Sequence, residues 1–198
     1  MRGEPAQFTQ SKMLCAVALD RAVQLTAEGT LPERKMEARW RGEAAAIRGF
    51  VDAHCWSDRQ HSYVRAASSE QLDASLLLAV LHGYASPEDA RMRQTVDAVA
   101  RELADGPFVR RYTAGDGLSG SEGAFLACSF WLAEALARTG RADAAVGLME
   151  KLLDLANDVG LYSEEIDPQD GDLLGNTPQA LSHLALISAA NAIDEAQG

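Results

Sequence analysis

The sequence predicts an all-α protein, in which an inner ring of helices is wrapped by an outer ring, and three observations lead to this fold class. Apolar residues recur at helical spacing through most of the chain, and the alternating patterns typical of strands are nearly absent. The predicted helices alternate between ones that are apolar almost all round and ones with a single apolar stripe. Short connections alternate with long ones. A toroid of helical hairpins has this pattern, whereas a plain bundle does not require it.

The periodicity predicts helices over residues 9–28, 33–54, 73–85, 88–105, 121–139, 141–158 and 178–195. The first, third, fifth and seventh are apolar on nearly every side, as in Ala74–Ala85, and we expect them to be buried in the inner ring. The second, fourth and sixth carry one narrow stripe each, such as the one that begins at Met92, and we expect them to face solvent on the other side.

The connections from an inner to an outer helix are short, whereas those that return to an inner helix span residues 55–72, 106–120 and 159–177. In a toroid the long connections, together with Met1–Phe8, would gather on one rim. Long loops on a rigid scaffold are where functional residues concentrate. We therefore look for the site on this rim.

Composition narrows the function classes. A length of 198 residues allows one domain with a substantial core, or part of a larger one, and no apolar run is long enough to cross a bilayer. A net charge of -11 disfavours nucleic acid and anionic membranes as partners. The three cysteines form no disulfide framework, and we place Cys15 and Cys128 in the core. Because the N-terminus does not read as a secretory signal, we expect a cytoplasmic location.

Two adjacent carboxylates, Glu164 and Glu165, lie in the last long connection, between Gly160 and Pro168. A loop bounded by Gly and Pro can aim carboxylates into a cleft, where they serve as general acids or bases. A solvated acidic turn is the plainer alternative.

A second rim loop contributes Arg111, Tyr112 and Glu122, a set suited to binding a polyhydroxylated ligand through charge-assisted hydrogen bonds. A surface ion-pair cluster is the alternative. Trp56, at the start of a third rim loop, is a weaker candidate for stacking on a sugar. Asp73 opens an apolar helix, and we expect it to be the N-cap.

The sequence indicates no metal site and no cofactor. The four histidines have no metal-ligand spacing, and we expect His183 to be a hydrogen-bonded core residue. The glycine-rich stretch 115–120 lacks the GK[ST] ending of a phosphate-binding loop.

Several segments, taken together and in order, carry a resemblance to a known family. They are Phe8–Lys12, Ala18–Ala22, Leu72–Leu77, Arg111–Tyr112, Glu122–Phe125, Cys128–Leu132, Gly160–Glu165, Gly175–Asn176, Pro178–Ala180 and Ser182–Ile187. The chain resembles the glucoamylase-like enzymes of glycoside hydrolase family 15, which include bacterial glucoamylases, glucodextranases and trehalases. The resemblance covers nearly all of residues 1–198.

The resemblance implies about half of an (α/α)6 toroid and inverting hydrolysis of a disaccharide or oligosaccharide of α-linked glucose, with one carboxylic acid and one carboxylate base. Glu164, in the Ser-Glu-Glu match, resembles the general base, and Glu165 is the competing assignment. Arg111 and Tyr112 match a motif whose arginine binds hydroxyls of the sugar being cleaved.

In the family the general acid is a Glu in a Trp-Glu pair, immediately before the stretch that resembles Met1–Phe8. We therefore expect this chain to be the C-terminal half of a catalytic domain, inactive alone, and either joined by an N-terminal half or assembled as a homo-oligomer. The alternative is a non-catalytic helical module that binds a carbohydrate or a protein.

Overall fold

The computed structural model describes residues 5–31, 34–112 and 123–198. Within these ranges the structure is mostly helical, which confirms the all-α prediction. Its α-helices are α1 (Thr9–Ala27), α2 (Glu37–His54), α3 (Leu78–Leu81), α4 (Ala90–Leu103), α5 (Leu126–Arg138), α6 (Ala142–Leu153) and α7 (Ala180–Gln197). Short 3-10 helices, η1 (Arg34–Met36) and η2 (Ala74–Leu77), precede α2 and α3.

Short strands also occur, where the sequence predicts almost none. They are β1 (Trp56–Ser57), β2 (Ser62–Tyr63), β3 (Ala104–Asp105), β4 (Phe108–Val109), β5 (Ala124–Phe125), β6 (Glu165–Ile166) and β7 (Leu173–Leu174). β1 pairs with β2, β3 pairs with β4, and β5, β6 and β7 form one antiparallel sheet with β6 in the middle. Each strand is two residues long, too short to leave a recognisable period in the sequence.

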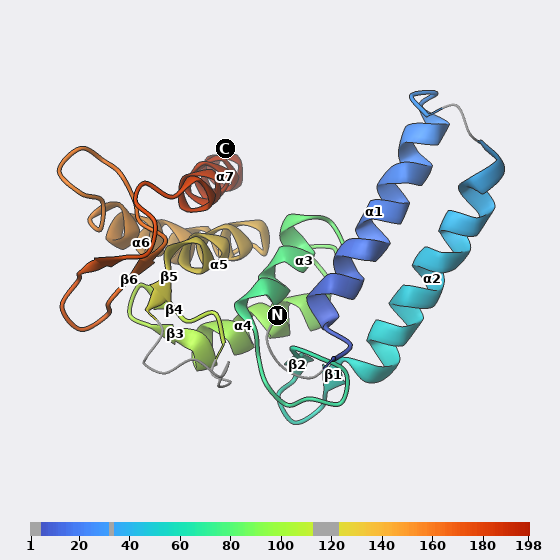
Figure 1. The fold of residues 1–198 in the computed structure, drawn as a ribbon, viewed down its shortest axis with the longest axis horizontal. Coiled ribbons are helices and arrows are strands. Elements are labelled where there is room, and N and C mark those ends of the chain that lie inside the picture. The colour runs from blue at the N-terminus through green and yellow to red at the C-terminus, as the bar shows by residue number, and fades with distance from the viewer. Residues whose placement is uncertain (1–4, 32–33, 113–122) are drawn as a thin grey trace.

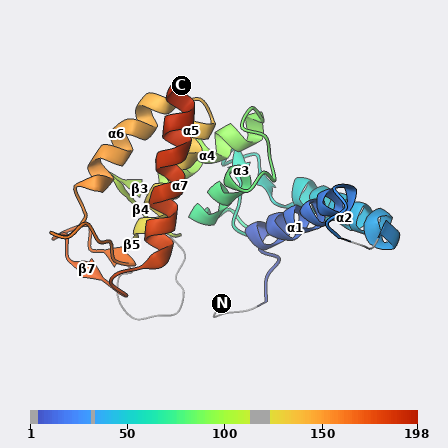
Figure 2. The same ribbon diagram turned by 90° about the horizontal axis from the view of Figure 1, so that it is seen from above.

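The helices form a row of hairpins. Figure 1 shows the α1–α2 hairpin projecting from one side of the molecule and α5, α6 and α7 gathered on the other, with α3 and α4 between them. Figure 2, from above, shows the same separation. α1 packs on α2, and α5 packs on both α6 and α7. The row therefore follows the order of the chain.

The alternation of inner and outer helices is clearest in the middle of the row. α5 is buried on nearly every side, whereas α4 buries one face through residues such as Met92, Val96 and Val99. The two polar residues of α5 that are buried among apolar ones both have partners. Ser129 Oγ accepts a hydrogen bond from the Val109 N–H at 2.9 Å, and Glu134 pairs with Arg138 at 2.7 Å.

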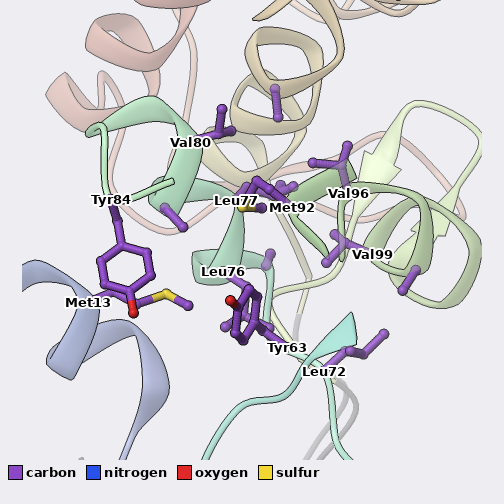
Figure 3. Packing of buried hydrophobic residues seen from close by; sticks show 14 of the residues in the cluster. Met13, Tyr63, Leu72, Leu76, Leu77, Val80, Tyr84, Met92, Val96 and Val99 are labelled. Atoms are coloured by element: carbon purple, nitrogen blue, oxygen red, sulfur yellow. The ribbon is translucent and has the colours of Figure 1, made fainter. Parts of the chain in front are cut away.

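The core consists of two clusters of buried apolar side chains. The first lies between α1, η2, α3 and α4 and includes Met13, Leu76 and Leu77 (Figure 3). The second lies between α5, α6 and α7 and includes Phe130 and Tyr162. Since burying a large apolar side chain stabilises a fold by about 1.5–3 kcal/mol, these clusters hold the hairpins together.

The helix predicted over residues 73–85 is shorter than expected. It begins as η2 and ends with α3 at Leu81, because Gly83 adopts a φ of +76° and the Tyr84 N–H donates back to the Ala79 carbonyl at 2.8 Å. Asp73 is the N-cap, as predicted, and accepts a hydrogen bond from the Ser75 N–H.

The two terminal inner helices keep one exposed apolar flank, unlike the middle ones. On α7 the stripe consists of Leu181, Leu184 and Ile187, spaced three residues apart and 44%, 64% and 57% exposed. On α1, Leu25 is exposed, and Cys15, which we expected in the core, is exposed too. None of the described helices is both long and apolar enough to cross a membrane.

We expect the stripe on α7 to cause self-association of the isolated chain, because contiguous exposed apolar surface drives association. Sedimentation velocity should show a dimer or a larger species. The double substitution Leu184→Glu, Ile187→Lys, which leaves the net charge unchanged, should shift the chain to monomer. Val159→Gln is the control, since Val159 is 70% exposed but lies outside the stripe. A monomeric wild-type chain over a wide concentration range would contradict this expectation.

Candidate active site

Antiparallel pairings bring the long connections together on one rim. Phe8 pairs with Ala66, Asp73 pairs with Tyr112, and Phe125 of β5 pairs with Glu165 of β6. These contacts link the N-terminal segment, the connection after α2, the one after α4 and the one after α6. The predicted gathering of the long connections on one rim is therefore confirmed.

The segment that carries both glutamates is fixed by main-chain hydrogen bonds to the start of α7 and the turn before it. Residues 162–164 are the fixed part, and residues 176–183 supply most of the partners. The hydrogen bonds run from Gln179 N–H to Tyr162 O (2.9 Å), from Tyr162 N–H to His183 Nε2 (3.4 Å), from Ser182 Oγ to Ser163 O (2.8 Å) and from Glu164 N–H to Asn176 O (2.9 Å). The Leu126 N–H, at the start of α5, donates to Glu164 O at 3.2 Å.

Tyr162 anchors this segment in the core. Its ring packs edge-on against Phe130, and its hydroxyl lies 3.2 Å from the Leu152 carbonyl, to which it donates a hydrogen bond. Burial, and secondarily the negative charge of Asp154, raises the pKa of the phenol. The hydroxyl therefore stays protonated and keeps donating at neutral pH. His183 is hydrogen-bonded, as predicted, since its Nδ1 also lies 2.7 Å from the Gln179 carbonyl.

Glu164 and Glu165 are both half-buried, but their carboxylates meet different partners. Glu164 Oε2 accepts hydrogen bonds from the Asn176 side-chain Nδ2 at 2.7 Å and from the Asn176 N–H at 3.2 Å. Glu165 Oε2 accepts one from the Gly123 N–H at 3.1 Å. The two carboxylates are thus held by different segments, Glu164 by the turn before α7 and Glu165 by the residue before β5.

Each glutamate lies against a glycine. A Cβ at Gly175 would lie 2.9 Å from Glu164 Cβ, and Gly175 has a φ of +72°. A Cβ at Gly123 would lie 3.0 Å from Glu165 Oε2. A larger residue at either position would push the neighbouring glutamate out of place, so these glycines are part of the site.

Arg111 and Tyr112 lie beside the same sheet. The Arg111 guanidinium stacks 4.9 Å from the Phe125 ring and donates through Nη2 to the Tyr112 hydroxyl at 2.9 Å. Because Phe125 and Glu165 are directly opposite in their strands, their side chains share one face. The structure thus places Arg111 against Phe125, the residue that pairs with Glu165, and Tyr112 beside Arg111.

Arg65 also belongs to this cluster, although the sequence analysis did not select it. Its guanidinium lies 4.4 Å from the centre of the Tyr112 ring, and its Nε lies 3.7 Å from Asp73 Oδ2. Arg111 also lies over the Tyr112 ring. Two arginines therefore stack on one tyrosine. The signal in the sequence was weak, a single basic residue in the connection after α2.

Trp56 is not among the residues brought together here. Its indole N–H donates to Asp58, its ring meets Tyr63 edge-on, and the Arg91 guanidinium lies over it. These contacts give Trp56 a packing role beside α4, and its role in sugar stacking remains an untested prediction. Glu122 lies outside the described residues. Within the described ranges, no cluster of His, Cys, Asp and Glu is arranged to hold a metal ion.

Comparison with known proteins identifies trehalases as relatives. The chain is 45% identical over 192 residues to the trehalase of Mycobacterium tuberculosis, covering 96% of this chain and 28% of that protein. It is 39% identical over 198 residues to the trehalase of Thermoplasma acidophilum, covering 98% of this chain and 33% of the other. The chain thus spans about a third of the length of these curated relatives.

Solved structures show the same fold. A glycosidase in complex with glucose matches with a TM-score of 0.82 at 23% identity, over 96% of this chain and 52% of its own. A bacterial glucoamylase complexed with acarbose matches with a TM-score of 0.79 at 15% identity, over 94% of this chain and 33% of its own. Residues 1–191 match the sequence family described as Glycosyl hydrolases family 15. The chain therefore belongs to glycoside hydrolase family 15, with the helical toroid fold of glucoamylase-like enzymes.

Proposed function

We propose that this chain supplies the general-base half of an inverting α-glucoside hydrolase, with Glu164 as the base. The observation that carries the proposal is the setting of the Glu164 carboxylate, in which Oε2 is held by Asn176 while Oε1 has no hydrogen-bond partner among the described residues. A base needs one oxygen anchored and the other available to a water molecule. Relatives described as trehalases favour trehalose as the first substrate to test.

In this mechanism, the oxygen of a water molecule attacks the anomeric carbon while the same water gives a proton to Glu164 Oε1. The bond to the leaving oxygen breaks on the opposite face of the sugar, and a general acid from outside this chain protonates that oxygen. The configuration at the anomeric carbon is inverted. Arg111, held by Phe125 and Tyr112, presents guanidinium donors to hydroxyls of the sugar being cleaved.

Glu165 takes a separate part in the proposal. Its carboxylate lies on the face shared with Phe125, over which Arg111 stacks, so it is suited to binding a sugar hydroxyl or orienting Arg111. With Glu164 as the base and Glu165 in substrate binding, each glutamate has a role that fits its own contacts. The cytoplasmic location expected from the sequence remains a further prediction.

We expect the isolated chain to show no appreciable hydrolysis of trehalose, maltose or isomaltose, because inversion requires two carboxyl groups. Activity should appear when the chain replaces the matching segment of the Mycolicibacterium smegmatis trehalase, which is 45% identical over 193 residues. The measurement is glucose release by each protein. Turnover by the chain alone would show that the general acid lies within it, whereas a folded but inactive chimera would favour the non-catalytic binding module.

The two glutamates should respond differently to substitution in that chimera. Glu164→Gln should lower kcat by at least about a hundredfold and leave KM nearly unchanged, because the amide keeps the shape of the side chain but cannot accept the proton. Glu165→Gln, the matched control, should retain much more activity and mainly raise KM. Steady-state kinetics on trehalose decides between them. If the effects are reversed, the base is Glu165.

A further inference from the structure

The turn between β7 and α7 holds the Glu164 side chain by one residue, Asn176. Both hydrogen bonds from Asn176 end on the same carboxylate oxygen, Oε2, at 2.7 Å from Nδ2 and 3.2 Å from the backbone N–H. A third hydrogen bond joins the main chain of the two residues, from the Glu164 N–H to the Asn176 carbonyl at 2.9 Å. Asn176 is thus hydrogen-bonded to both the backbone and the side chain of Glu164.

Gly175 gives this arrangement its shape. With a φ of +72° it turns the chain so that the Asn176 N–H points at the carboxylate, and its missing side chain leaves the space in which Glu164 lies. A side chain here would be strained by the backbone and would meet Glu164 Oε2 at 3.0 Å. The Glu164 carboxylate therefore lies against Gly175, and one of its oxygens is hydrogen-bonded to Asn176.

We infer that Asn176 is a positioning residue for Glu164, an inference that rests on the proposed function. It fixes the rotation of the carboxylate so that Oε1 is directed away from the turn and is available to a water molecule. Both of its donors are uncharged N–H groups, which suit an ionised carboxylate, and hydrogen bonds of this kind are stronger than those between neutral groups. Asn176 does not touch the reacting atoms itself.

The residue type at this position follows from that role. Aspartate has nearly the same shape as asparagine but lacks the Nδ2 donor and would place a second negative charge beside Glu164. Alanine keeps the backbone N–H and loses the shorter of the two bonds. Serine keeps the backbone bond and offers a hydroxyl donor on a shorter side chain. The order of activity should therefore be asparagine, serine, alanine and aspartate.

Kinetics on trehalose test this order in the chimera described above. Asn176→Ala should lower kcat about tenfold or more with KM changed less than about threefold, since a misoriented base affects the chemical step rather than substrate binding. Asn176→Ser should recover part of the loss, and Asn176→Asp should lose at least as much as alanine. Asn191→Ala, on the exposed side of α7, is the matched control and should be unchanged.

An aspartate variant as active as wild type, an alanine variant with unchanged kcat, or a loss confined to KM would each overturn the inference. Circular dichroism melting of each variant separates a loss of folding from a loss of positioning. If alanine destabilises the fold, the nearly isosteric aspartate variant and the serine variant, which keeps a hydroxyl donor, still test the inference.

A second measurement uses the 198-residue chain alone and does not depend on activity. In nitrogen-15 NMR spectra, the side-chain amide protons of Asn176 should exchange with solvent about tenfold more slowly than those of Asn191, because Glu164 binds one of them. Glu164→Ala should abolish the difference. Equal exchange in the wild-type chain would overturn the inference, whereas an inactive chimera with slow Asn176 exchange would reject the proposed function and leave the contact with Glu164 established.

Discussion

The hydrogen bonds between residues 162–164 and residues 176–183 are the constraint on which the candidate site depends. Each is worth only about 0.5–1.5 kcal/mol net, but leaving a buried main-chain group unpaired costs more than making the bond gains. Glu164 is therefore held in place by the start of α7 and the turn before it. α7 in turn lies against α5 through small buried residues such as Ala185 and Ala189, which let the two helices approach closely. The position of the proposed base is thus set by helix packing well outside the site.

Aromatic rings organise the cationic side of the site in a similar way. Arg111 stacks on Phe125 and Tyr112, and Arg65 stacks on Tyr112 from the connection after α2. Long arginine side chains lose rotamer freedom when they are ordered, and stacking on a ring offsets that cost before any ligand binds. Because Phe125 lies opposite Glu165, its ring connects Arg111 to the strand that carries Glu165.

The sequence predicted what depends on local pattern, and missed what depends on register between distant segments. The start of α1 at Thr9 and the end of α2 at His54 follow from periodicity and agree with the structure. The helix expected from residue 121 begins at Leu126, because Ala124 and Phe125 pair with β6 instead. For the site, the pairing of the long connections with one another was predictable. The parts played by Asn176, Gly175 and Arg65 were not, since their neighbours become apparent only once the strands and loops are aligned.

The pairings on the rim also have a consequence for the order in which the chain folds. The helical hairpins join segments that are close in sequence, whereas Thr9 binds the Val64 carbonyl across 55 positions and Gly123 binds Glu165 across 42. Contacts between distant positions form slowly, because a long loop must close before they gain anything. The hairpins should therefore form early and the rim late, so that the helices are in place before the loops that carry the two glutamates. The segment that carries Glu164 would reach its final position only after α7 had docked against α5.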